Sequence, residues 1–186
     1  MRFSLFLFLI LASLSSIAQT EPDKSDLKRE IVINNEKFRV YNNWVNLGAG
    51  VAKITNLDGE WFTGGIGYNF HIKAHYFQFG MDVEGEHFGS YVNTGFHLCY
   101  GDRKETPKFN LSYFAGISYS QGYKQQDRTY KFFRAPGLYV CAQFIKKLKY
   151  DLGLGPGVFA DINQTRAVFG IRLDLYFSSA YRGKKK

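Results

Sequence analysis

Beyond its first eighteen residues the chain lacks any apolar run that could cross a bilayer as a helix, which takes roughly 20 residues. The N-terminal run FSLFLFLILASL is itself shorter than this, follows Arg2, and ends near the small residues Ser16 and Ala18. This pattern predicts that residues 1–18 are a cleaved secretory signal peptide and not an anchor helix. No cysteine lies near the cleavage site, so lipoprotein processing is not indicated. Membrane insertion of the mature chain must therefore use strands.

Proline is also scarce, with 4 residues, whereas glycine reaches 19 and aromatic residues make up 18% of the chain. Small and ring-bearing residues with few long helix-forming stretches are typical of strands and turns, so we predict an all-β protein. The formal net charge is +8, with basic clusters at 146–149 and 184–186. An exported chain meets little nucleic acid, so we expect no nucleic-acid partner and attribute the charge to anionic lipid headgroups or to solvation.

Only two cysteines are present, Cys99 and Cys141, and we expect both to be free thiols that face inward. The predicted strand order separates them by two ladder spacings of about 4.8 Å each, which exceeds the Cα separation of about 7 Å that a disulfide tolerates. The four histidines lack metal-ligand spacing, and no G-x-S-x-G, Walker or dinucleotide motif occurs. We therefore predict no catalytic, cofactor or metal site. The histidines are His71, His75, His87 and His97.

The chain divides into four predicted parts: the signal peptide (1–18), a polar leader with a short hairpin (19–42), a barrel (43–178) and a basic tail (179–186). The hairpin is predicted because Asn34 and Asn35 separate two alternating runs; whether it joins the barrel is open. Eight alternating segments follow, joined by short connectors that favour antiparallel neighbours. In each segment the bulky apolar residues occupy every second position. The segments are 45–51, 62–72, 77–83, 92–100, 109–119, 136–144, 152–162 and 167–177.

The opposite parity of these segments contains small and charged residues, including 12 of the 19 glycines. An eight-stranded barrel has an interior only just wide enough for side chains, so the bulky parity must face outward. An apolar outer wall is stable in hydrocarbon, where a closed barrel leaves no backbone group unpaired. We therefore predict a closed antiparallel up-and-down transmembrane β-barrel of about eight strands.

Several charged residues lie at positions that we assign to the inside of the barrel. Because buried charges must be paired, we predict that they form a network in the lumen with a structural role. Gating of a pore or binding of a cation is the alternative reading. The predicted members are Asp82, Glu84, Glu86, Arg134, Arg172 and Asp174.

Aromatic residues near the segment ends suit the two interfacial girdles of a membrane barrel. Pro156 cannot donate to a ladder, and we expect a bulge there. The predicted girdle residues are Trp44, Trp61, Tyr76, Tyr91, Tyr100, Tyr123, Tyr150 and Phe177.

Over residues 43–177 the chain resembles the small bacterial outer-membrane β-barrel superfamily, typified by the transmembrane domain of outer membrane protein A. The resemblance rests on the signal peptide, the eight segments and the last strand RAVFGIRLDLYF, which ends at Phe177. It implies a location in the bacterial outer membrane, contact with membrane lipids and lipopolysaccharide, and recognition by the assembly machinery. We expect a monomer. The sequence SSAYRGKKK after Phe177 and the short outer loops depart from the family pattern.

The function predicted from these features is a structural or surface-interaction role without a wide pore, and no enzymatic activity. One alternative is a lipid-modifying enzyme, since His87 and Ser90 resemble the His and Ser of small outer-membrane lipid A acyl-modifying enzymes. Another is a soluble periplasmic barrel that carries an apolar ligand, which would require the apolar residues to face the lumen.

Overall fold

The structure is a computed structural model that describes residues 29–55, 61–73, 75–86, 92–126 and 129–185. For residues 86, 124–126, 129 and 130 it describes the backbone alone. The predicted signal peptide and residues 19–28 of the leader lie outside the described residues and stay predictions. Within the described ranges no helix is long and apolar enough to cross a membrane.

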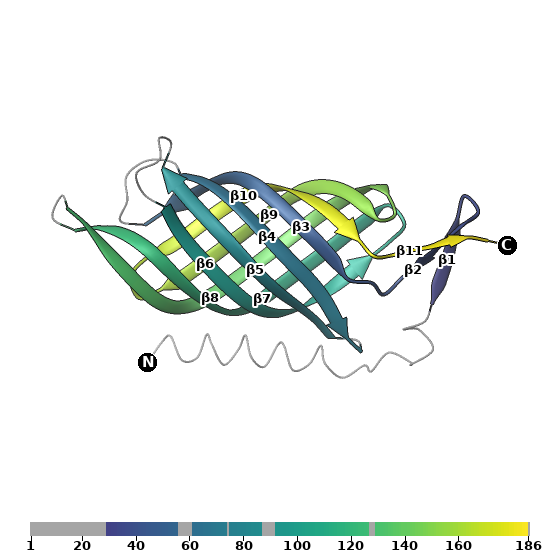
Figure 1. Cartoon of the computed structure of the whole chain (residues 1–186), viewed down its shortest axis with the longest axis horizontal. Helices are drawn as coiled ribbons and strands as arrows, with labels where there is room; N and C mark the ends of the chain where they lie inside the picture. The colour runs from purple at the N-terminus through teal and green to yellow at the C-terminus, as the bar shows by residue number, and fades with distance from the viewer. Residues whose placement is uncertain (1–28, 56–60, 74, 87–91, 127–128, 186) are drawn as a thin grey trace.

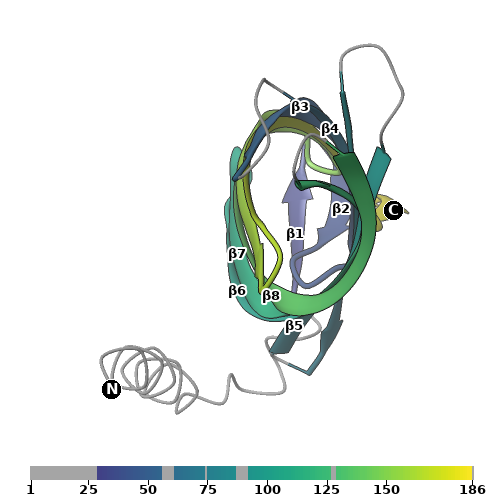
Figure 2. The ribbon, with the colours of Figure 1, turned by 90° about the vertical axis from the view of Figure 1, so that its left-hand side faces the viewer.

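Eight antiparallel strands form a closed barrel in the order β10-β3-β4-β5-β6-β7-β8-β9 (Figures 1 and 2). Every strand pairs with its neighbours in sequence, and the pairing of β10 with β3 closes the barrel. The predicted up-and-down topology is therefore confirmed. The strands are β3 (Trp44–Ile54), β4 (Trp61–Ile72), β5 (His75–Glu86), β6 (Val92–Glu105), β7 (Phe109–Gln126), β8 (Thr129–Lys149), β9 (Leu152–Asn163) and β10 (Ala167–Ser178).

Alternation along each strand separates an apolar outer wall from a polar lumen. Phe79, Leu98 and Ile171 are 55%, 49% and 60% exposed on the outer wall. Glu84 and Arg172 are 1% and 5% exposed, because their side chains point into the lumen. The predicted face assignment is thus confirmed, and an apolar-ligand carrier, which needs the inverse arrangement, is excluded.

Three of the predicted girdle aromatics lie inside the barrel and a fourth, Tyr150, is buried against Phe38, so that part of the girdle prediction was wrong. Trp44, Trp61, Tyr76 and Tyr150 are all at most 5% exposed. The first three have the inward parity of their strands, next to outward neighbours such as Val45, and ring size does not override this parity. The lumen is consequently filled by large rings as well as by small residues and charges. Tyr100, Tyr123 and Phe177 are on the outer surface, and Tyr91 lies outside the described residues.

Strands β7 and β8 are 18 and 21 residues long and extend past the rest of the barrel. The last β6–β7 pair on this side is Thr94–Gln121, and the last β8–β9 pair is Gly137–Asn163. Beyond these pairs β7 and β8 continue the ladder only with each other and form a two-stranded ribbon, residues 122–126 and 129–136. At the base of the ribbon, Oδ1 of Asn93 on β6 accepts a hydrogen bond of 2.7 Å from the backbone N–H of Tyr123. Figure 1 shows this ribbon at one end of the barrel.

A separate three-stranded sheet, which we call the cap, lies at the opposite end (Figure 1). It consists of β1 (Glu30–Ile33), β2 (Glu36–Arg39) and β11 (Tyr181–Lys184), in the order β1-β2-β11. Viewed along the barrel in Figure 2, β1 and β2 are visible across the far mouth.

The cap contains the predicted hairpin, which pairs with the C-terminal segment and not with the barrel. Asn34 and Asn35 have φ angles of 51° and 64°, as the tight turn of a two-residue hairpin requires. Strand β11 lies within the segment predicted as a basic tail, where Tyr181 pairs with Phe38.

The ladder between β8 and β9 is interrupted opposite Pro156, but its register does not change there. The pairs Gln143–Gly157 and Lys146–Leu154 on either side keep the same register. The register shift lies between Lys147 and Lys149 instead, so the bulge predicted at Pro156 was wrong. Because Pro156 lacks only its own N–H, the strands can pass it without an extra residue.

Candidate functional site: the lumen charge network

Four of the predicted network residues lie in the lumen, where Asp82 and Glu84 come from β5 and Arg172 and Asp174 from β10. All four are at most 5% exposed. The side chain of Glu86 lies outside the described residues.

Arg134 is exposed on the outer surface of β8, so its assignment to the lumen was wrong. It has the same parity as the outward residues Leu138 and Val140, which the alternation of the strand requires. Its guanidinium carbon lies 5.3 Å from the centroid of the Phe132 ring on the ribbon.

The centre of the network is Arg172, which bridges two carboxylates. Its Nη1 donates to Oδ1 of Asp82, and its Nε lies 3.8 Å from Oδ1 of Asp174. The Asp174 carboxylate also accepts a hydrogen bond of 3.0 Å from Nε2 of Gln143. The guanidinium carbon lies 4.5 Å from the Phe159 ring centroid, so an aromatic face covers the cation.

The carboxylate of Asp161, on β9 next to β10, is held by two hydroxyl groups of β7. Ser118 donates to Oδ1 over 2.5 Å, and Ser120 donates to Oδ2. Nearby, the His97 ring stacks on Tyr139 with a centroid separation of 3.8 Å. These contacts order the lumen by direct hydrogen bonding and ring packing.

At the ribbon end of the lumen, Glu84 is paired with Arg166, whose Nη2 lies 3.1 Å from Oε2. Arg166 is at the end of the β9–β10 connector, where Oδ1 of Asn163 accepts its backbone N–H over 3.0 Å. This turn directs the Arg166 side chain back into the barrel, with its guanidinium carbon 5.2 Å from the Phe133 ring centroid.

A chain of amide groups lies nearer the cap. Nδ2 of Asn69 donates to Oδ1 of Asn46 over 2.7 Å, and Nε2 of Gln78 donates to Oδ1 of Asn69 over 2.9 Å. The thiol of Cys141 donates to Oε1 of Gln78 over 3.2 Å. Both Cys141 and Cys99 are buried and unbridged, as predicted.

At the capped mouth, Arg103 and Lys147 both bind Glu105. Nη2 of Arg103 lies 2.6 Å from Oε1 of Glu105, and Nζ of Lys147 donates to the same oxygen. Arg103 also donates to the Tyr176 hydroxyl over 2.6 Å, and its guanidinium carbon lies 4.2 Å from the Trp44 ring centroid.

Arg103, Glu105 and Lys147 were missing from the predicted network because we placed them in connectors, and Arg166, the first residue of the last predicted strand, was left out of it. Each has the inward parity of the strand beside it: Arg103 and Glu105 follow Cys99, and Lys147 follows Cys141. Continuing each alternation past the predicted end of its segment would have identified these residues.

The network therefore joins four of its buried cations to carboxylates and packs them against rings. Its side chains fill the lumen from Arg166 to Lys147 and bind one another. Among the residues that the structure describes, no group of three or more His, Cys, Asp or Glu side chains could hold a metal ion.

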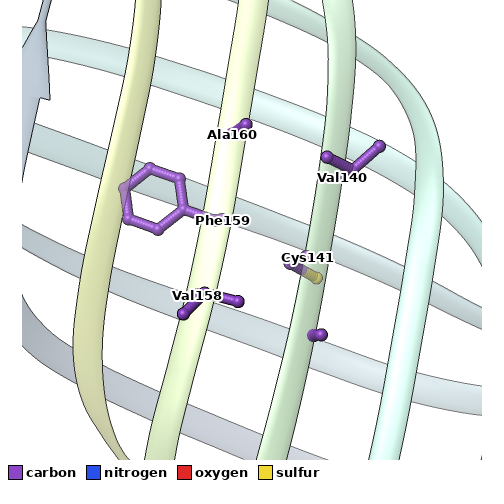
Figure 3. Close-up of a pocket in the computed structure, with 6 residues that line it drawn as sticks. Val140, Cys141, Val158, Phe159 and Ala160 are labelled. Carbon is purple, nitrogen blue, oxygen red and sulfur yellow. The ribbon is translucent and has the colours of Figure 1, made fainter.

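A shallow apolar depression lies on the barrel wall between β8 and β9 (Figure 3). Its outward side chains are small: Val140 pairs with Ala160, and Ala142 pairs with Val158. Because it belongs to the apolar outer wall, lipid chains would fill it in a bilayer.

No protein-family model and no curated protein matches the chain. Among solved structures, Neisserial surface protein A (NspA) has a TM-score of 0.59 at 13% identity, covering 73% of this chain and 96% of that chain. Ail, the attachment invasion locus protein of Yersinia pestis, has a TM-score of 0.56 at 8% identity, covering 74% and 98%. The N-terminal β-barrel domain of Pseudomonas aeruginosa OprF has a TM-score of 0.51 at 12% identity, covering 73% and 96%.

The fold is that of the small outer-membrane β-barrels. The apolar outer wall agrees with this fold, because a membrane-spanning barrel faces lipid. Side chains such as Phe79 and Ile171 are stable on the surface only in contact with hydrocarbon. Fold and wall together show a barrel built to span a membrane.

Proposed function

We propose that the protein is a non-enzymatic outer-membrane barrel that acts by surface interaction and not by transport through its lumen. The observation that carries this proposal is the filled interior: the chain of buried contacts from Arg166 to Lys147 occupies the lumen of an eight-stranded barrel. Planar-bilayer recording of the full chain should show no large, stable conductance. Steps comparable to those of a wide diffusion pore would contradict the proposal.

The ribbon is the part of the barrel best placed for a surface interaction. The first and last described strands, β1 and β11, lie at the capped end, and the connectors there are short, at 73–74, 106–108 and 150–151. Short connectors are typical of the periplasmic side of outer-membrane barrels. The ribbon then projects from the outer leaflet, which consists of lipopolysaccharide.

The ribbon carries rings and cations on its exposed surface. The Tyr123 and Phe132 rings lie 5.6 Å apart, edge to face, and Arg134 covers Phe132 from 5.3 Å. Phe132 is 53% exposed and Lys131 is exposed beside it. Aromatic faces with adjacent cations suit the sugars and phosphates of lipopolysaccharide.

The experiment compares wild type with Phe132→Ser/Arg134→Gln in bilayers with and without lipopolysaccharide. Lipopolysaccharide should raise the urea midpoint of wild type, and the double variant should lose most of that rise, because ligand binding to the folded state is stabilising. Gln164→Ser, an exposed change at the same end, is the control and should keep the rise. An equal rise in all three proteins would contradict a role for the ribbon.

A lipid-modifying enzyme is the second candidate from the sequence. Its two residues, His87 and Ser90, lie outside the described residues, so this alternative stays a prediction. An acylation change in lipopolysaccharide that is lost in His87→Ala would support it.

A further inference from the structure

Exposed lysines gather at the capped rim of the barrel, where strands β6 and β8 end and β7 begins. Lys104, Lys108 and Lys146 are all exposed. Within the part of the chain that the structure describes, the ion pairs involve other residues and none of these three. Their charges therefore face outward without an opposite charge from the barrel.

The three lysines surround one point of the outer wall. Lys104 on β6 pairs with Leu111 of β7, and Lys146 on β8 pairs with Phe109 of the same strand. They thus lie on the two sides of β7, on strands two ladder spacings or about 10 Å apart, and their partners are two positions apart along β7. Lys108 directly precedes Phe109, and its carbonyl accepts a hydrogen bond of 2.8 Å from the backbone N–H of Lys147, which ties this turn to β8.

The apolar wall begins immediately beside this cluster. Phe109, Leu111 and Phe144 are 40%, 41% and 46% exposed, and the Phe109 and Phe144 rings stack at 5.4 Å. These side chains face hydrocarbon. Lys108 lies one position before Phe109 and Lys146 two positions after Phe144, whereas Lys104 pairs with Leu111, so the three lysines border the apolar wall and can lay their stems along it.

The acidic residues nearby are engaged elsewhere. Asp102 has the outward parity of Lys104, but its carboxylate accepts hydrogen bonds from the Arg103 backbone N–H at 2.7 Å and from the Tyr113 hydroxyl at 3.3 Å. Glu105 faces the lumen, where it binds Arg103 and Lys147. With three lysines and one acidic side chain on this part of the outer surface, the local charge is positive.

We propose that Lys104, Lys108 and Lys146 form a binding site for the headgroup of an anionic phospholipid in the periplasmic leaflet. Three ammonium groups at the border of the apolar wall complement a phosphodiester whose acyl chains lie along Phe109 and Leu111. The proposal requires the barrel to be in a bilayer, but it does not depend on the contact of the ribbon with lipopolysaccharide.

The test uses the full chain in phosphatidylcholine vesicles that contain spin-labelled phosphatidylglycerol or spin-labelled phosphatidylcholine as the probe. Wild type should immobilise the anionic probe preferentially, and K104Q/K146Q should lose most of that preference, since each surface lysine contributes about fivefold near anionic lipid. K53Q/K73Q removes the same charge from exposed residues outside the cluster and should keep the preference. K104R/K146R, which keeps the charge, should keep it as well.

Several outcomes would overturn the site. They are an absence of preference in wild type, an equal loss in K104Q/K146Q and K53Q/K73Q, or a loss in K104R/K146R as large as in the glutamine variant. Heat-dependent gel migration reports folding of each variant, and all four substitution sites are exposed. Because lipopolysaccharide is not present, the result does not depend on the ribbon.

Discussion

Arg172 on β10 and Asp82 on β5 form an ion pair through the lumen although β3 and β4 separate their strands. The pair can form because Gly48 and Gly65 face inward on the two intervening strands. A Cβ atom at Gly65 would lie 3.0 Å from Cζ of Arg172, and one at Gly48 would lie 3.1 Å from its Cδ. The glycines of the inward parity thus provide the space that the charges occupy.

Replacement of Arg172 by methionine keeps most of the side-chain volume and removes the charge. Asp82 and Asp174 are then buried without their cation, which should cost about 3–5 kcal/mol of unfolding free energy. Urea unfolding in lipid vesicles measures the loss. Arg172→Met/Asp82→Asn should recover part of it, and a loss below about 1 kcal/mol in the single variant would contradict a structural role for the network.

Gly116 marks a position where β6 and β7 approach too closely for any side chain. A Cβ atom there would lie 2.5 Å from Cα of Cys99 and 2.8 Å from the carbonyl carbon of Leu98. Gly116→Ala should therefore destabilise the barrel by about 1–3 kcal/mol in the same unfolding assay. Gly64→Ala is the control, since its added methyl group would meet Gly48 O at 3.8 Å, an ordinary contact. Equal stabilities of the two variants would disprove the close approach.

The ring of Phe38 on β2 packs against two other rings, Tyr150 in the turn after β8 and Tyr181 on β11. It is 5% exposed, with its centroid 5.0 Å from Tyr150 and 5.7 Å from Tyr181. Phe38→Ala should speed amide hydrogen exchange in the cap strands while barrel amides keep their protection, because the two sheets are separate units of hydrogen bonding. Val32→Ala, at a half-exposed position of β1, should change little. Faster exchange throughout the barrel would show that cap and barrel open together.

The two buried thiols should both titrate as free sulfhydryls in unfolded, unreduced protein. Cys99 and Cys141 lie on β6 and β8, with β7 between them. A thiol reagent should therefore find two groups per chain. A titration that finds none would require a disulfide that the strand order does not allow.

The parity of the strands could be predicted from sequence because it depends on side-chain volume and on the narrow lumen. Phe79 outward and Glu84 inward follow from that argument alone. The inward rings were not predicted, since Trp44 and Trp61 near strand ends also suit a membrane girdle. Their parity, which they share with Asn46 and Thr63, was the better guide.

Strand ends were harder to predict than strand existence. Charged residues such as Arg103 and Lys147 are common in turns, so we ended the strands before them although the alternation continues. Strand β11 pairs with β2, which is distant in sequence, and the ribbon extends beyond the last residues of the neighbouring strands β6 and β9. No local sequence pattern specifies either feature. Arg134 was a different case: its parity was readable but was assigned to the wrong face.

The central claim is that the apolar parity of the strands faces lipid. The most direct test is site-directed spin labelling of the outward positions of β10 in bilayers, with Cys99 and Cys141 replaced by alanine. The positions are Phe169, Ile171, Leu173, Leu175 and Phe177, all between 42% and 60% exposed. Collision with oxygen should peak at Leu173 and collision with an aqueous nickel chelate should be lowest there, as expected across a bilayer. Uniform access of the nickel chelate to all five positions would contradict the membrane assignment.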